Sequence, residues 1–450
     1  PAPLPIIGNK LSLRGADQTY QSLIRWSKEY GPVYTYWIGE IPIVNVASYQ
    51  LIKDTFIKEG DAFAGRDFFK DAYTICKPTN GLHGVVGTEG EQWRQLRRFS
   101  LQVLRNLGMG RNRMEEMIHL EVETLLDTID ENLCKNVQEH DIISLVDLAV
   151  GSVLNQIIFG HRFLGDSQQE FYMLKAILDE HIKAFDNIIT NTVLMVPWMR
   201  HFPIFSQAFD RFEKRIARIY SIESQTILST HFWMRSKKAV RIASKNTILI
   251  IVFIITLAVV LHFETTSNTL RFLILYMMLY PEIQRKMQQE LAQSADNNNW
   301  IKYEDRLKFP YTNAVISETQ RCCNLLAQNL NHRTTRDMEI RGHKIRKHTL
   351  IVPQISCIFP NAKQFVPERF LDQSGQLKKV EEFIPFSVGK RICLGESMAR
   401  MELFLFTANL FHRYKISVTD ENNPPSAEQQ AGLTMSTVAY KCRIERQILL

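Results

Sequence analysis

One ten-residue segment near the end of the sequence constrains this chain more than any other: Phe386–Gly395, with the sequence FSVGKRICLG. Gly389 and Gly395 flank Cys393, and glycine permits backbone angles and close approaches that a side chain would block. Residues 396–412 have the composition of a helix, whose N-terminus would stabilise a thiolate beside it. The segment predicts a turn that presents Cys393 as a thiolate metal ligand. A buried structural cysteine in a glycine-containing turn is the alternative.

The fixed positions of this segment agree with F-x-x-G-x-R-x-C-x-G, and the segment therefore resembles the cysteine-ligand signature of the cytochrome P450 family. The resemblance implies haem b held by the Cys393 thiolate, with Arg391 beside an anionic haem propionate. It also implies a mainly α fold with a small β region, in which haem lies between a central helix and the helix that follows the cysteine loop.

Hydrophobic periodicity along the chain is consistent with that fold. The sequence has 450 residues, 45% of them hydrophobic, which is enough to bury a large core. Residues 1–450 are expected to form a single catalytic domain with a proline-rich hinge at 1–9, β-rich parts mainly at 33–60 and 339–356, and helical parts mainly at 91–330 and 396–412. The individual helices are expected at 17–31, 91–106, 112–135, 140–160, 167–190, 207–230, 265–280, 282–294 and 311–325.

Two further motifs resemble positions that meet the haem propionates in the family. Trp93 and Arg97 are spaced i, i+4, which places an indole donor and a guanidinium on one helix face. Simple packing is the alternative for such a pair. His332, in the stretch His332–Asp337, resembles a third propionate contact, although a single histidine is more often a satisfied core or surface residue.

Glu318 and Arg321 resemble the Glu-x-x-Arg pair of the family, and the i, i+3 spacing lets the two side chains pair along one helix face. Arg369, within Pro367–Phe370, resembles the arginine that joins this pair. The resemblance implies that the three are structural and hold the cysteine loop. A solvated surface pair is the alternative for any single Glu-x-x-Arg.

Glu264 and Thr265 resemble the acid and hydroxyl that deliver protons during oxygen activation in the family. The chain departs from the family pattern just before them, because Leu261 and His262 stand where two small residues are usual. Bulky side chains there would crowd the oxygen site. Haem binding is therefore better supported by the sequence than turnover.

A charge-free stretch, Thr247–Leu261, precedes these residues. As a helix it would extend about 22 Å, short of the roughly 30 Å hydrocarbon core of a bilayer. A buried core helix is the favoured interpretation, and a membrane span or an incorrectly joined chain are the alternatives. The sequence between about 230 and 264, and that between Ser356 and Phe365, is also shorter than the family pattern.

The net charge of +7 is mild for this length and does not indicate nucleic-acid binding. The seven cysteines include no C-x-x-C pair, which favours reduced thiols. Residues 94–113 contain six arginines and no acid, a composition that fits a basic face for an acidic redox partner, or an ordinary solvated helix.

Finer features, in Trp93–Leu101, Glu264–Asn268 and His332–Asp337, resemble microsomal family-2 members, and residues 318–337 are most similar to nematode ones. The resemblance implies a monooxygenase on the cytoplasmic face of the endoplasmic reticulum membrane, with the N-terminal anchor absent from this chain. Electrons would come from NADPH through a separate flavoprotein reductase, with cytochrome b5 as a second partner. The substrate would be small and apolar: a lipid, steroid or xenobiotic.

Two other functions remain open at this point. One is a haem-binding relative that is catalytically impaired or not an oxygenase, because of Leu261 and His262. The other is a small membrane protein built around Thr247–Leu261. Candidate walls of a substrate pocket, assigned by region only, are Phe68, Phe69, Phe171 and Phe185.

Overall fold

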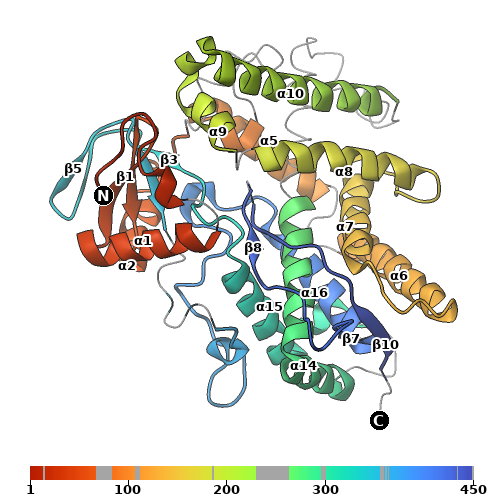
Figure 1. Ribbon diagram of the computed structural model, residues 1–450. Helices are drawn as coiled ribbons and strands as arrows, with labels where there is room; N and C mark the ends of the chain where they lie inside the picture. The colour runs from red at the N-terminus through yellow and green to blue at the C-terminus, as the bar shows by residue number, and fades with distance from the viewer. Residues whose placement is uncertain are drawn as a thin grey trace.

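The computed structural model describes residues 1–13, 16–66, 84–106, 112–184, 187–229, 263–294, 300–354, 359, 362, 364–432 and 434–447. A small β region lies at one side of a larger helical region (Figure 1). The segments Thr247–Leu261 and His262, the residues Phe68, Phe69 and Phe185, and most of the connection from Ser356 to Phe365 lie outside the described residues.

The β region is a four-stranded sheet in the order β1-β2-β6-β3. Strands β1 (Val33–Ile38) and β2 (Ile41–Val46) form a hairpin within the expected β-rich part, rich in β-branched and aromatic residues. Strand β2 pairs in parallel with β6 (Leu350–Pro353), so two segments about three hundred residues apart share one sheet. Strand β3 (His332–Arg333) completes the other edge. Smaller pairs join β4 (Met338–Ile340) to β5 (His343–Ile345), β7 (Tyr414–Ser417) to β10 (Arg443–Arg446), and β8 (Gln429–Gln430) to β9 (Ser436–Thr437).

The β-rich part expected at 33–60 is shorter in the structure. After Val46 the chain turns into α2 (Tyr49–Ile52) and the π-helical turn η2 (Lys53–Ile57). These turns bury Ile52 and Phe56 beneath the sheet. The π-helical turn η2 matters for the site because the cysteine loop packs against it.

The helices otherwise follow the expected ranges closely. They are α1 (Ala16–Tyr30), α4 (Gly84–Gly87), α5 (Gly90–Asn106), α6 (Asn112–Cys134), α7 (Ile142–Phe159), α8 (Ser167–Ala184), α9 (Ile188–Met195), α10 (Pro203–Ser229), a central helix at 263–279, α14 (Pro281–Ser294), α15 (Pro310–Cys323) and α16 (Glu396–Arg413). Short 3-10 turns are η1 (Lys10–Leu13), η3 (Pro197–His201), η4 (Tyr303–Lys308), η5 (Pro367–Phe370) and η6 (Gly389–Arg391).

The single helix expected at 167–190 is wrong. Helix α8 ends at Ala184, and a separate helix, α9, starts at Ile188. Asn187 is the N-cap of α9, and its side chain accepts hydrogen bonds from the backbone amides of Ile189 (2.9 Å) and Thr190 (3.1 Å). An asparagine cap satisfies amides that a continuous helix would pair with its own carbonyls.

The core lies around the central helix and α16 (Figure 1). Fourteen of the eighteen residues of α16 are buried, so this helix is enclosed on all sides. The central helix is enclosed in the same way from Phe263 to Met278, apart from a few partly buried positions. Among the described helices, none combines the length and apolarity needed to cross a bilayer.

Candidate haem-thiolate site

The cysteine loop is a tight turn that packs against η2. The backbone amide of Cys393 donates to the carbonyl oxygen of Phe386 (2.9 Å), which closes the loop. Gly389 has φ +73°, and a Cβ atom there would lie 2.0 Å from the carbonyl oxygen of Phe56. Glycine is therefore required at 389 both by its backbone angle and by the close approach of η2.

Cys393 lies directly before the N-terminus of α16. The backbone amides of Gly395 and Glu396 and the guanidinium of Arg97 lie close enough to favour a negative charge on its sulfur. Burial raises the pKa of Cys393, while these amides and Arg97 oppose the rise. The residue nevertheless keeps an exposed surface. The thiol is thus accessible on one side and faced by backbone amides on another. These are the surroundings that a metal-bound thiolate needs.

Three arginines form a cluster beside the cysteine loop, in which Arg66 and Arg97 lie close enough to Arg391 to act on its charge. Arg391 is 8% exposed and donates to the carbonyl oxygens of Ala64 (2.8 Å), Val85 (3.0 Å) and Thr88 (2.7 Å). Burial, followed by the charges of Arg66 and Arg97, lowers the pKa of Arg391 to about 8. The nearby Glu89 is already bound to Arg333 and to the backbone amide of Arg66. The arginine cluster therefore carries more positive charge than the described acids around it neutralise.

Two donors in this cluster have no hydrogen-bond partner among the described residues. They are the buried indole nitrogen Nε1 of Trp93 and the buried Nε of Arg66. The ring of Trp93 lies 4.0 Å from the guanidinium carbon of Arg391, a cation–π contact. Buried polar groups are normally satisfied, so these donors indicate an anionic ligand. Unpaired donors, excess positive charge and an accessible thiol fit the two propionates and the iron of haem.

His332 belongs to the same region. Its Nδ1 lies 2.7 Å from the carbonyl oxygen of Phe63, and its ring packs edge-on against Phe56, with ring centroids 4.9 Å apart. Burial, together with the charges of Arg66 and Arg391, lowers its pKa well below the ordinary value. The ring is therefore a neutral imidazole whose Nδ1–H donates to the Phe63 carbonyl oxygen, and a bound anion would favour protonation of Nε2, which could then donate to that anion. Arg97 reaches the cysteine loop directly, donating to the carbonyl oxygen of Ile392 (2.9 Å).

The three residues predicted to be structural, Glu318, Arg321 and Arg369, lie together between α15 and η5. Arg321 donates twice to Glu318, from Nε to Oε2 (2.6 Å) and from Nη2 to Oε1 (2.8 Å). Arg369 joins from the other side, with its Nε 3.3 Å from Oε1 of Glu318. Glu318 is fully buried, so this cluster is an ion pair of the interior and not a solvated surface pair.

Glu264 and Thr265 lie in the first described turn of the central helix. Glu264 is buried, and burial raises its pKa to about 7. Among the described residues, the groups that bond to Glu264 or act on its charge lie on the central helix, α7 and α8, and not in the arginine cluster. Phe171 of α8 packs in the core against Phe163 and Phe263, with ring centroids 5.4 and 5.6 Å apart. It is a core residue in this structure.

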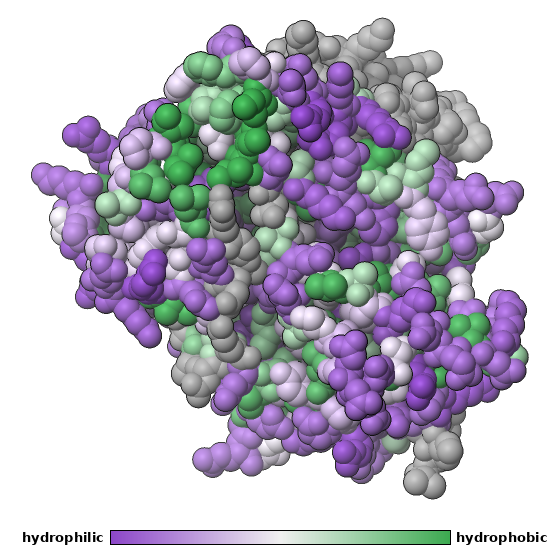
Figure 2. Space-filling model, in the orientation of Figure 1, coloured by the Kyte–Doolittle hydropathy of each residue, from purple (hydrophilic) through white to green (hydrophobic). Residues whose placement is uncertain are grey.

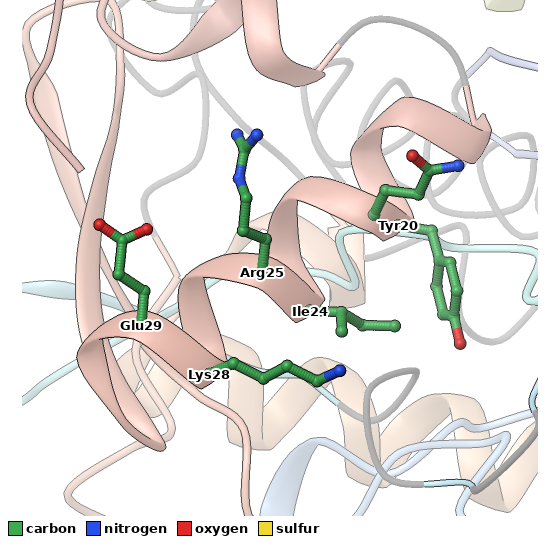
Figure 3. A pocket seen from close by; sticks show the side chains of 6 residues that line it. Tyr20, Ile24, Arg25, Lys28 and Glu29 are labelled. Atoms are coloured by element: carbon green, nitrogen blue, oxygen red, sulfur yellow. The ribbon is translucent and has the colours of Figure 1, made fainter.

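An open surface depression among the described residues lies elsewhere, on α1. Its volume is about 630 Å³, and it is lined by Tyr20, Gln21, Ile24, Arg25, Lys28 and Glu29. In Figure 3 the side chains of Ile24 and Lys28 point to one side of α1 and those of Arg25 and Glu29 to the other. Such an open depression over one helix shares no residue with the cysteine loop or the arginine cluster.

Arg66 was not predicted from the sequence. It is buried, and its Nη1 donates to the carbonyl oxygens of Leu330 (2.9 Å) and Asn331. These partners lie more than 260 residues away in the sequence. No spacing pattern marks a lone arginine after Ala64-Gly65, so only the folded chain places it beside Arg391.

Comparison with known proteins identifies the family of the chain. The chain belongs to the cytochrome P450 family, whose model matches residues 1–444. Its relatives include cytochrome P450 2C16 of Oryctolagus cuniculus, which is 32% identical over 446 residues, covering 92% of this chain and 87% of the relative. Cytochrome P450 2M1 of Oncorhynchus mykiss is 33% identical over 471 residues, covering 99% and 92%. Cytochrome P450 2F2 of Mus musculus is 31% identical, covering 92% and 87%.

The resemblance to microsomal family-2 proteins is thereby confirmed. The protein is a haem monooxygenase that uses haem b and takes electrons from NADPH through a flavoprotein reductase. It acts on small molecules and associates with the membrane of the endoplasmic reticulum.

Proposed function

We propose that Cys393 is the axial thiolate ligand of the haem iron, and that Trp93, Arg97, His332 and Arg391, together with Arg66, hold the two propionates. The observation that carries this proposal is the pair of unpartnered buried donors, Trp93 Nε1 and Arg66 Nε, beside excess positive charge. The amides of Gly395 and Glu396 would stabilise the negative charge of an iron-bound thiolate and tune its donor strength. When bound, haem supplies the reductive activation of O2, and the protein supplies orientation and a proton path.

Glu264 and Thr265 are the residues that move protons in this proposal. A carboxyl with a pKa near 7 can both release and accept a proton at neutral pH, which suits a general acid. Glu318, Arg321 and Arg369 act at a distance: Arg321 also donates to the carbonyl oxygens of Ala362 and Gln364, both at 2.8 Å, and so anchors the chain that leads into the cysteine loop.

The substrate in this proposal is small and apolar, either a lipid, a steroid or a xenobiotic, and residues 1–450 act as one catalytic domain. One oxygen atom of O2 enters a C–H bond of that substrate, and the other leaves as water after taking up electrons from NADPH and protons. The catalytically impaired relative is the second candidate, favoured by Leu261 and His262 in the sequence.

The test combines a spectrum with turnover. Purified protein loaded with haem and reduced under CO should show the absorption of a thiolate-ligated haem, and Cys393→Ser should abolish it. Cys134→Ser, at an exposed cysteine at the end of α6, is the matched control and should leave the spectrum unchanged. A thiolate spectrum with no reductase-dependent oxidation of any of a panel of lipids, steroids and xenobiotics would favour the impaired relative. Retention of the spectrum in Cys393→Ser would overturn the ligand assignment.

The reductase and cytochrome b5 would dock on α5 in this proposal. The side chains of Arg94, Arg98 and Arg105 are exposed along this helix, while Arg97 of the same helix reaches the cysteine loop. A positively charged face next to the thiolate loop suits acidic electron-transfer partners.

We also propose that an apolar patch places the protein on the cytoplasmic face of the endoplasmic reticulum membrane. The apolar patch consists of five exposed side chains: Leu4, Ile6, Trp198, Phe202 and Ile204. The segment with Leu4 and Ile6 and the segment that leads to Trp198 meet at the turn of the β1–β2 hairpin. A Cβ atom on Gly39 in that turn would lie 3.1 Å from Val196 and 3.5 Å from the carbonyl oxygen of Ile6. Figure 2 shows apolar residues gathered over this hairpin and α9. Such a patch fits the interfacial region of a bilayer.

A further inference from the structure

A buried polar network runs along one face of the central helix, beyond the haem-thiolate site. Glu264 is 6% exposed and Asn268, one turn later, is 1% exposed. The Asn268 amide nitrogen Nδ2 donates to Oε2 of Glu264 (3.2 Å). The other carboxyl oxygen, Oε1, is buried and has no hydrogen-bond partner among the described residues. One oxygen of this carboxyl is therefore held, and one is left for proton exchange.

The orientation of the Asn268 amide is fixed by its second neighbour. Arg271 donates from Nη1 to Oδ1 of Asn268 (3.1 Å). A guanidinium only donates hydrogen bonds, so the amide oxygen must face Arg271 and the amide NH2 must face the other way. The NH2 then points to Glu264 and to the hydroxyl of Thr434 (3.4 Å).

Arg271 is itself held by two residues, Asp147 and Tyr440, through three hydrogen bonds. Its Nε donates to Oδ1 of Asp147 in α7 (2.9 Å), its Nη2 pairs with the second oxygen of Asp147, and Tyr440 donates to its carbonyl oxygen (2.6 Å). Asp147 also pairs with Lys175 of α8 (3.5 Å), which pairs with Asp179 (2.6 Å). Helices α7 and α8 thus fix the arginine that fixes the amide.

We propose that Asn268 is a positioning residue for Glu264: its amide, set in one orientation by the Arg271–Asp147 pair, holds one carboxyl oxygen of Glu264 and leaves the other free to exchange protons. This deepens the proposed function, because it rests on Glu264 as the proton donor. The sequence alone did not single out Asn268, whose role depends on contacts with α7.

The electrostatic consequence can be worked out from the charged groups around Glu264. Burial raises its pKa most, Asp179 and Asp147 raise it further, and Arg271 and Lys175 lower it. A hydrogen bond donated to a carboxylate favours the charged form. Asn268 therefore opposes burial, and its removal raises the pKa of Glu264.

The test is an infrared titration of the haem-loaded resting protein, following the carbonyl band of the protonated carboxyl of Glu264. Subtracting the spectrum of Glu264→Gln at each pH isolates that band. In Asn268→Ala the midpoint at which the band disappears should move up by about one to two pH units, since a hydrogen bond to a charged group is lost. Asn268→Leu, which fills the same space without a donor, should give the same shift if the alanine variant does not fold.

The matched control is Thr269→Val. Thr269 is a buried polar neighbour whose hydroxyl donates to the carbonyl oxygen of Thr265 (2.7 Å) within the helix, so its variant should leave the midpoint in place. An unchanged midpoint in both Asn268 variants, or an equal shift in Thr269→Val, overturns the proposal. The titration needs neither substrate nor reductase, so a protein without turnover still gives a decisive result.

Discussion

At position 389 the cysteine loop has no room for a side chain, and this gives a sharp test at the scale of one residue. Gly389→Ala forces a Cβ atom to 2.0 Å from the carbonyl oxygen of Phe56 and also strains φ +73°. The loop must shift, so we expect most of the haem-thiolate spectrum to be lost. Gly375→Ala is the control, because Gly375 has φ +78° but nothing within 4 Å of the added atom. Its cost should be backbone strain alone, about 1–2 kcal/mol, with the spectrum intact. Equal spectra in the two variants would contradict the assigned role of η2.

The residues of the site were predictable where local spacing carries the signal. Cys393 and Arg391 share one turn, Trp93 and Arg97 share one helix, and the structure brings all four together at the cysteine loop. Arg66 and Asn268 were missed for a physical reason. Their partners, Asn331 and Asp147 among them, are far away in sequence or act through a second side chain.

At the scale of elements, the Glu318 cluster joins α15 to η5 and makes a prediction about stability. Glu318→Gln leaves the buried Arg321, whose side chain is 4% exposed, without its countercharge. Breaking a buried pair from one side costs about 3–5 kcal/mol of unfolding free energy. Chemical denaturation monitored by circular dichroism measures this loss, and haem retention at equal temperature should fall with it.

The control for this prediction is Glu368→Gln on the same η5 turn. Glu368 pairs with Lys286 (2.7 Å), but both side chains are about half exposed. Exposed pairs contribute about 0–1 kcal/mol. A similar loss in both variants would mean that the Glu318 cluster is not a special link between α15 and η5.

Elements were predictable wherever a long amphipathic or wholly apolar pattern marks a helix. Helices α5, α6, α14 and α15 begin and end within a few residues of their expected ranges. The break between α8 and α9 was not predicted, because Asn187 caps a helix inside a continuously helical pattern. The parallel pairing of β2 with β6 could not be predicted either, since hydrophobic alternation shows which face of a strand is buried but not its partner.

At the scale of the whole molecule, the apolar patch predicts how the protein sits on a membrane. Trp198 and Phe202 are each about half exposed, and their rings pack together with centroids 5.9 Å apart. If each buries roughly 100 Å² of apolar surface in a bilayer, the pair contributes a few kcal/mol to binding. The double variant Trp198→Ser, Phe202→Ser should therefore bind phosphatidylcholine–phosphatidylserine vesicles at least about tenfold more weakly in co-sedimentation. Leu307→Ser is the matched control, because Leu307 is 74% exposed but lies on η4, outside the apolar patch. Equal weakening by the control, or unchanged binding of the double variant, would show that general surface hydrophobicity or charge, and not this patch, holds the protein on the membrane.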